Sequence, residues 1–286
     1  MKIFRNARLR KQPGLYDILV DGEKTVRIAP AGRLEPAPEE RDLQGRLVSA
    51  PYVESHIHLD YVYTAMTPEE ETKSGTLFEA IDRWADAKNS LSKEEIKERA
   101  MRGIRQEMRN GVQYIRTHVD VTEPKLTALK ALLELREEMK DRLYLQLIAF
   151  PQEGYYAYPG GDELVEEALR LGADVVGGIP HYEFTRELGE KSVKKAFALA
   201  EKYDRLVDIH CDETDDPQSR FVECIASEAY YTGLGSRATA SHTCAMGSYS
   251  NAYAFKMMSK FRKAGINFVS CPTENCCLQG RYDAYP

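Results

Sequence analysis

The stretch Val53-Glu54-Ser55-His56-Ile57-His58-Leu59-Asp60 is a short apolar run that ends in two histidines separated by one residue. Side chains two positions apart on an extended strand point to the same side, so His56 and His58 can both face one cavity while Ile57 faces the opposite layer. Neutral imidazole is a common metal ligand. The pair is therefore interpreted as half of a metal site, with a polar strand end as the alternative.

Helical patterns and apolar, strand-like runs alternate after Ser74. Two helices are expected first, one beginning at the capping-box spacing Thr76-Leu77-Phe78-Glu79 and one running from Ser92 to Asn110-Gly111. Six apolar runs separated by helical patterns follow, at residues 112–119, 143–150, 175–179, 206–211, 238–241 and 266–270. This alternation is typical of buried parallel strands in an α/β fold.

The expected fold class is α/β, a TIM-like (β/α)8 barrel that is incomplete. With the histidine strand counted first, about seven barrel strands are expected, whereas a closed barrel of this kind has eight. Residues 1–50 contain short strand patterns broken by turns, such as Asp21-Gly22, and are interpreted as the N-terminal part of a small β-sandwich module. Residues 51–286 are then the barrel, lacking its last strand and a C-terminal segment.

Composition excludes several classes of function. The chain has 286 residues, of which 43% are hydrophobic and 29% charged, as in ordinary globular proteins. A net charge of −6 offers no basic surface for a phosphate backbone, so nucleic acid is not an expected partner. No secretion signal and no apolar run of roughly 18 residues is visible, which favours a cytoplasmic protein without a membrane partner. The six cysteines form no C-x-x-C pair, so a zinc ribbon or a disulfide scaffold is not expected.

Each of the six histidines lies at or just beyond the end of one apolar run: His56, His58, His118, His181, His210 and His242. In a parallel barrel these strand ends open on one face, where active sites of such barrels are built. One histidine could cap a strand, but six at one face favour a functional site. A metal held by three histidines lowers the pKa of a bound water toward about 7.

Two further side chains stand at strand ends. Glu213, three residues after His210, can reach over the same cavity and move protons between water and substrate; the alternative is a loop carboxylate that is solvated or paired with Arg220. Gln152 could pair through its amide with an amide-like ring edge, although a lone glutamine is more often a loop residue. The fourth strand ends without a Lys or Glu that could bridge two metals, so one metal ion is expected.

The chain resembles the amidohydrolase superfamily, and within it the bacterial cytosine deaminases. The matching stretches are Val53 to Asp60, Ser74-Gly75-Thr76-Leu77-Phe78-Glu79, Arg116-Thr117-His118-Val119-Asp120-Val121, Ala149-Phe150-Pro151-Gln152-Glu153-Gly154, His210-Cys211-Asp212-Glu213 and Ser241-His242-Thr243. The zinc deaminases with His-x-Glu and Pro-Cys-x-x-Cys motifs are a different class that this sequence does not match.

The resemblance implies a residue-by-residue assignment. His56, His58 and His210 would be ligands of one divalent metal ion, Fe2+ or Zn2+, and Glu213 would be the proton shuttle. His242 would polarise the attacking hydroxide, and Gln152 would hold the edge of a pyrimidine base, the expected small-molecule partner. The implied reaction is hydrolytic deamination of cytosine to uracil and ammonia by a metal-bound hydroxide, as in pyrimidine salvage.

The sequence also departs from the superfamily pattern. Members continue beyond this length and carry, after the eighth strand, an aspartate that completes the metal site; this sequence ends at Tyr285-Pro286. The alternatives to a cytosine deaminase are therefore a related amidohydrolase acting on isocytosine or an amino-triazine, and an inactive truncated remnant. The polar, cysteine-rich segment Glu274-Asn275-Cys276-Cys277 receives no assignment from the sequence, and a homo-oligomer remains open.

Overall fold

The structure is a computed structural model that describes residues 1–64 and 73–280. The chain divides into two compact units, Met1–Tyr52 and Val53–Pro286. That the first unit belongs to a β-sandwich stays a prediction. Among the described helices, none combines the length and the apolar character needed to cross a membrane.

The first unit is a small sheet in which β1 is central. Its strands are β1 (Lys2–Leu9), β2 (Tyr16–Asp21), β3 (Lys24–Pro30), β4 (Glu39–Asp42) and β5 (Leu47–Val48). The order is β3-β2-β1-β4, with β5 also paired to β1. β1 pairs antiparallel with β2 and parallel with β4. A small apolar cluster of Ile3, Ala29 and Leu34 forms its buried core.

Seven strands form the sheet of the second unit, in the order β12-β11-β10-β9-β8-β7-β6. They are β6 (Tyr52–Ile57), β7 (Val112–Asp120), β8 (Tyr144–Phe150), β9 (Val175–Gly178), β10 (Leu206–Cys211), β11 (Ala238–His242) and β12 (Asn267–Val269). From β7 to β12 every neighbouring pair is parallel. The expectation of an incomplete α/β barrel with seven strands is therefore confirmed.

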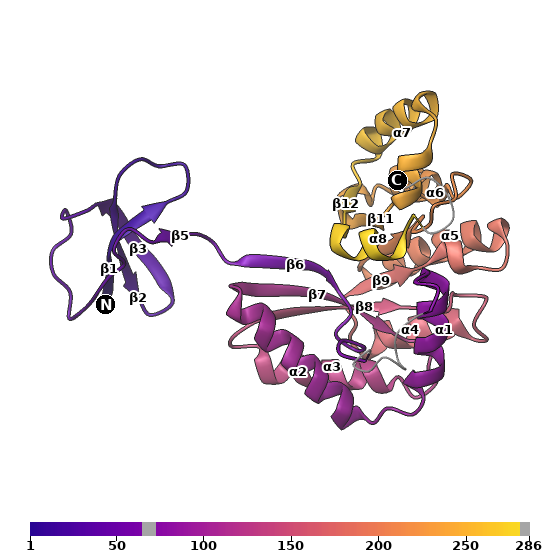
Figure 1. Ribbon diagram of the computed structural model, residues 1–286, viewed down its shortest axis with the longest axis horizontal. Coiled ribbons are helices and arrows are strands. Elements are labelled where there is room, and N and C mark those ends of the chain that lie inside the picture. The colour runs from indigo at the N-terminus through magenta and orange to yellow at the C-terminus, as the bar shows by residue number, and fades with distance from the viewer. Residues whose placement is uncertain (65–72, 281–286) are drawn as a thin grey trace. The chain divides into compact units, whose positions relative to one another are not determined.

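Helices alternate with these strands. They are α1 (Leu77–Lys88), α2 (Lys93–Arg109), α3 (Thr127–Met139), α4 (Gly161–Leu171), α5 (Arg186–Tyr203), α6 (Phe221–Thr232), α7 (Asn251–Ala264) and α8 (Pro272–Leu278), with short 3-10 turns η2 (Pro180–Tyr182), η3 (Gly235–Arg237) and η4 (Cys244–Ser248). In Figure 1, α2 and α3 lie along β7 and β8, and both helices contact β7. Buried apolar faces of the helices and strands form one large core.

Strands β8 to β11 are buried over most of their length, whereas β12 at the edge of the sheet is mostly exposed. All four residues of β9 are buried, and a Cβ on Gly177 would lie 2.7 Å from the carbonyl oxygen of Ala149. Glycine is therefore required there by the close approach of β8, rather than by a turn. Continuous burial explains why these strands read as apolar runs in the sequence.

The N-terminus of α1 differs in one detail from the expected capping box. Thr76 accepts a hydrogen bond from the backbone N–H of Glu79, as the spacing predicts. The Glu79 carboxylate instead accepts from the backbone N–H groups of Lys73 and Ser74, at 2.7 and 2.6 Å. These bonds lower the pKa of Glu79 to about 2, with the Ser74 hydroxyl as the largest cause. The carboxylate thus fixes the turn before the helix.

Candidate metal centre and active site

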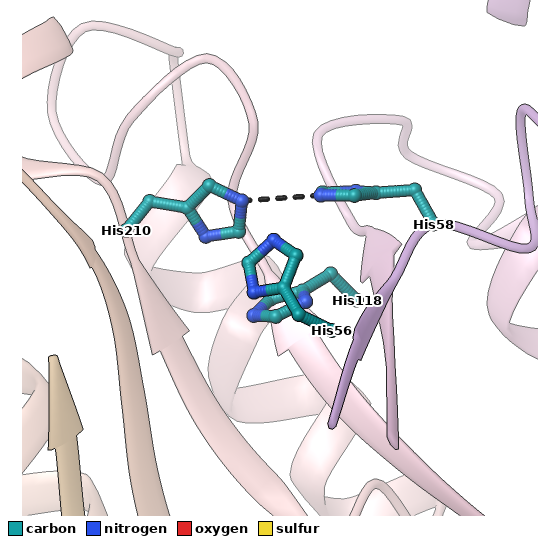
Figure 2. A group of neighbouring side chains, drawn as sticks. All are labelled: His56, His58, His118 and His210. Carbon is teal, nitrogen blue, oxygen red and sulfur yellow. Dashed lines mark hydrogen bonds between the residues drawn. The ribbon is translucent and has the colours of Figure 1, made fainter. Parts of the chain in front are cut away.

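Four imidazoles meet at the carboxyl ends of three strands of the second unit. His56 is on β6 with His58 directly after it, while His118 is on β7 and His210 is on β10. Figure 2 shows the four rings turned toward one another. One ring nitrogen from each residue lies within 4.8 Å of the others. His118 was predicted to lie at a strand end but was not predicted to be a metal ligand. The structure places it in one group with the three predicted ligands.

The contacts within this cluster require uncharged rings. The Nε2 atoms of His58 and His210 are 3.1 Å apart, and those of His56 and His242 are 3.2 Å apart. Burial, followed by the neighbouring histidines, lowers the pKa of His56, His58 and His210 well below the usual value. Neutral imidazole is the form that binds a metal ion.

Several buried ring nitrogens have no hydrogen-bond partner among the described residues. They include Nδ1 of His56, His58 and His210, and both ring nitrogens of His118. A buried polar atom without a partner costs free energy, so such a cluster persists where another function requires it. Four imidazoles within reach of one point fit a divalent transition metal, which prefers nitrogen ligands.

Asp208 lies two residues before His210 on β10, so the two side chains point to the same face of the strand. Its carboxylate accepts from Arg116 Nη1 at 3.1 Å and from Ser241 Oγ at 2.7 Å. His118 Nε2 is 3.8 Å from the same carboxylate. Burial raises the pKa of Asp208, but the neighbouring His118, the hydrogen bond from Ser241 and the Arg116 guanidinium together outweigh burial and lower this pKa. This ionised carboxylate therefore lies next to the histidine cluster, which it approaches at His118.

Glu213 follows β10 and is 1% exposed. The preceding residue, Asp212, adopts a positive φ of 49° and its carboxylate accepts from Ser219 Oγ and from the backbone N–H groups of Phe221 and Val222. These bonds tie the strand end to the first turn of α6. The left-handed backbone at Asp212 costs energy, and the three bonds maintain it. Glu213 is thereby directed into the site rather than into solvent.

The environment of Glu213 contradicts the solvated alternative and the pairing with Arg220. Its Oε1 lies 3.2 Å from His242 Nδ1, whereas Arg220 donates to the carbonyl oxygen of Pro217 and covers the ring of Tyr253. Burial, and then the neighbouring carboxylate of Glu274, raise the pKa of Glu213 well above the usual range. A carboxyl group with a raised pKa can hold and release a proton near neutral pH.

His242 ends β11 with a positive φ of 68°, followed by Thr243 at 52°. The Thr243 N–H donates to the carbonyl oxygen of Cys211 at 2.8 Å, which fixes this turn against β10. Burial lowers the pKa of His242 to about 4. His242 forms a third possible ligand group with His210 and Glu213. It therefore lies between the four-histidine cluster and the carboxylate.

Helix α8 supplies the side chains that the sequence left unassigned. Asn275 donates through Nδ2 to Glu213 Oε1 at 3.1 Å, and its Nδ2 and Oδ1 lie 3.1 and 3.2 Å from His242 Nδ1. Cys271 and Glu274 come within 4.8 Å of His56 and His242 as a further group. No spacing or periodicity in the sequence predicted these contacts, because they depend on how the chain turns after β12.

Gln152 follows β8 and is 5% exposed. Its backbone N–H is 3.4 Å from Asp120 Oδ1. Asp120 also accepts from Trp84 Nε1 at 2.7 Å and from Lys88 Nζ at 3.0 Å, and Lys88 forms a second ion pair with Glu153. A buried network thus fixes the loop that carries Gln152.

His181 is the strand-end histidine that the structure leaves apart. It lies in η2 after β9, and none of the possible ligand groups found among the described residues includes it. Burial lowers its pKa to about 3. Five of the six histidines are therefore brought together, as the predicted strand-end arrangement implied.

The fold and sequence match known proteins over most of the chain. A 5-methylcytosine deaminase from Klebsiella pneumoniae, solved with 5-fluorocytosine, is 51% identical with a TM-score of 0.94, covering 99% of this chain and 69% of that one. An N-isopropylammelide isopropyl amidohydrolase from Pseudomonas sp. (strain ADP) is 30% identical over 275 residues, covering 94% of this chain and 67% of the relative.

A pterin deaminase from Rhizobium rhizogenes is 26% identical over 277 residues, or 93% of this chain and 60% of the relative. The chain thus spans about two thirds of the length of these proteins. The sequence-based expectation of a hydrolytic enzyme acting on C–N bonds is confirmed by these matches. The model of the amidohydrolase family matches residues 39–286, and the chain belongs to that family.

Proposed function

We propose that this protein deaminates cytosine hydrolytically, giving uracil and ammonia. The observation that carries the proposal is the buried cluster of neutral imidazoles beside a buried carboxyl group, Glu213. The 51% identical relative, named a 5-methylcytosine deaminase and solved with 5-fluorocytosine and with phosphonocytosine, supports the choice of a cytosine ring.

In this proposal His56, His58 and His210 hold one divalent metal ion, Fe2+ or Zn2+. Such an ion, when bound, supplies chemistry by lowering the pKa of water at the site. His118 belongs to the same ligand group and is a further nitrogen within reach of that ion.

The chain's own residues then carry the protons and the substrate. His242 accepts a hydrogen bond from the attacking water, and Glu213 takes a proton from it as the oxygen bonds to the ring carbon bearing the amine. Glu213 passes this proton to the adjacent ring nitrogen. It then takes the second proton from the oxygen now bound to the ring carbon and gives it to the amine, so that the C–N bond breaks as the carbonyl forms and ammonia leaves. Gln152 pairs with the opposite, amide-like edge of the ring.

Replacing Glu213 by Gln tests the assignment directly. Because the amide keeps the shape but cannot carry the proton, we expect turnover to fall by about 10²- to 10⁴-fold. Metal content, measured by elemental analysis, should be unchanged, since Glu213 is not one of the proposed ligands. A Glu213→Gln protein with the wild-type rate would refute the role of this residue.

The ring itself is tested by a substrate panel. Steady-state release of ammonia should be compared for cytosine, 5-methylcytosine, isocytosine, an amino-triazine and a pterin. The N-isopropylammelide and pterin relatives make the last two the main alternatives. Preference for a triazine or pterin would correct the substrate, and a metal-loaded chain that acts on none of these rings would contradict the proposal.

A further inference from the structure

We propose that Glu183 is a positioning residue: its carboxylate fills a concave group of backbone N–H donors in the loop after β8 and thereby holds Gln152 against the substrate ring. The catalytic part of this proposal rests on the proposed function, in which Gln152 pairs with the ring edge. The structural part, the hold of Glu183 on the loop, does not depend on which ring is the substrate.

Three successive backbone N–H groups converge on the Glu183 carboxylate. Oε1 accepts from Tyr155 at 2.6 Å, Oε2 accepts from Ala157 at 2.9 Å, and the N–H of Tyr156 lies 3.3 and 3.2 Å from the two oxygens. Successive N–H groups arranged in this way form an anion-binding concavity, or nest. We call the N–H groups of residues 155–157 the loop nest. Its anion is a side chain of the same protein.

Glu183 is itself buried at this position. It follows η2 directly and is 8% exposed. Burial raises the pKa of Glu183, and the three backbone bonds lower it by less. The described partners of its two oxygens are all N–H donors, which is the pairing that an ionised carboxylate makes. Because a buried carboxylate without donors is costly, Glu183 and the loop nest stabilise each other.

The glycine before the loop nest is required by this carboxylate. Gly154 has a φ of +87°, and a Cβ at this position would lie 3.1 Å from the carboxylate carbon and from both oxygens of Glu183. Glycine therefore meets two needs here, a left-handed backbone and the close approach of an anion. The loop is thus shaped around the Glu183 side chain.

Gln152 lies in the turn that ends at this glycine. The N–H of Gly154 donates to the carbonyl oxygen of Pro151 at 2.9 Å, so Gln152 and Glu153 are the two central residues of a four-residue turn. On one side the turn is anchored by the ion pair between Glu153 and Lys88. On the other side the loop nest begins at the next residue. Two charged anchors therefore fix the backbone that carries Gln152, as precise substrate positioning requires.

A second link keeps the loop attached to β9 when the Glu183 side chain is removed. Tyr155 is 1% exposed, and its hydroxyl group donates to the carbonyl oxygen of Gly177 at 2.8 Å. The backbone N–H of Asp162 donates to the carbonyl oxygen of Tyr155 at 3.2 Å. Truncation of Glu183 should therefore loosen the segment around Gln152 without unfolding the barrel.

The structural part is tested in Glu183→Ala by hydrogen exchange of the loop, measured by mass spectrometry. Without the charged acceptor, we expect the N–H groups of residues 155–157 to exchange about 10- to 100-fold faster. Added formate, a carboxylate small enough to enter the emptied nest, should slow this exchange again, whereas the neutral formamide should not. Glu187→Ala, on the exposed first turn of α5, is the matched control and should exchange as wild type does.

The catalytic part is tested by a double-mutant cycle with Gln152→Ala in the metal-loaded protein. If Glu183 acts through Gln152, Glu183→Ala should lower kcat/KM for cytosine about 10-fold when Gln152 is present and much less when it is absent. Formate should recover part of the lost kcat/KM only when Gln152 is present. Metal content and melting temperature should stay near the wild-type values.

Unchanged loop exchange in Glu183→Ala would refute the proposal, and so would an equal loss of kcat/KM with and without Gln152, which is the result expected of a merely structural residue. If Glu183→Ala does not fold, Glu183→Gln, which keeps one acceptor oxygen, replaces it in the same cycle with a smaller expected effect; failure of both to fold would show that Glu183 is structural. If the wild-type protein deaminates no ring, the proposed function fails, and exchange with formate rescue still decides whether Glu183 holds the loop.

Discussion

Two clusters of polar side chains, one in each unit, satisfy their hydrogen bonds in opposite ways. In the small sheet, Asp17 is fully buried and accepts from Arg5 Nη1 at 2.8 Å, Asn6 N at 3.1 Å and Gly32 N at 2.9 Å, while Arg5 also pairs with Glu40. In the barrel, buried ring nitrogens of His56, His58, His118 and His210 have no partner among the described residues.

The difference separates a structural cluster from a functional one. Both oxygens of the Asp17 carboxylate accept hydrogen bonds that join β1, β2 and the turn after β3. The role of Asp17 is therefore to stabilise the fold. The histidine cluster leaves several buried ring nitrogens without a hydrogen-bond partner among the described residues, which is expected where a ligand completes the site. Removing a group should therefore cost stability in the first cluster and function in the second.

The largest effect is expected from His210→Gln. The change removes one imidazole from the centre of the cluster, so bound zinc measured by elemental analysis should fall from about one ion per chain to nearly none, and deamination should be lost with it. The unfolding free energy of the metal-free protein should fall only modestly, because Nδ1 of His210 has no partner among the described residues and its Nε2 has only the Nε2 of His58. Full retention of zinc would show that His210 is not a ligand.

A second large effect, on stability rather than metal content, is expected from Lys88→Met. Lys88 is buried between Asp120 and Glu153, and burial lowers its pKa less than these carboxylates raise it. Without the ammonium group two carboxylates lose their cation, at a cost of about 3 to 5 kcal/mol of unfolding free energy. Urea unfolding followed by the fluorescence of Trp84, the single tryptophan, measures it. An unchanged midpoint would contradict this estimate.

The barrel could be predicted from the sequence because its signals are local. Strands β8 to β11 are buried over most of their length and therefore appear as apolar runs, and capping residues such as Ser92 mark the helix starts. The histidines at strand ends could be placed on one face for the same reason: parallel strands all end at the same edge.

The rest of the site could not be predicted because it depends on tertiary packing. Asn275 reaches Glu213 and His242 only because α8 turns back over the strand ends after β12, and a seven-residue polar helix carries no periodic signal of such a turn. His118 was predicted to lie at a strand end but not to be a ligand, because its distance to the other rings depends on the fold.

A smaller stability effect is expected in the other unit from Asp17→Ala. Arg5 and two backbone N–H groups would lose their acceptor in a buried position, which costs about 1 to 3 kcal/mol. Amide exchange in β1 and β2 should become faster, while zinc content and kcat should remain at wild-type levels. A loss of zinc in Asp17→Ala would mean that the two clusters are not independent. Asp42→Ala, on exposed β4, is a milder control in the same sheet.

The two units should also respond to different ranges of pH. Burial holds the pKa of His242 at about 4 and that of His181 at about 3, against the usual 6.5, so below pH 6.5 the unfolded chain binds more protons than the folded one. Metal-free barrel stability should therefore fall between pH 6.5 and 5, on the order of 2 kcal/mol per histidine.

Asp17 contributes to stability over a different range of pH. Burial raises the pKa of Asp17, but the bond from Arg5 and the backbone bonds outweigh burial and lower it below the usual value of 3.8. Its contribution to stability is therefore lost only as the pH falls below that value. At pH 5, Trp84 fluorescence should thus report a weakened barrel while amide exchange in β1 and β2 stays as at pH 7. Added zinc should restore the barrel more effectively at pH 7 than at pH 5, because protons compete for the same imidazoles. If the barrel and the small sheet both lost stability at pH 5, the distinction between the Asp17 cluster and the histidines of the barrel would be contradicted.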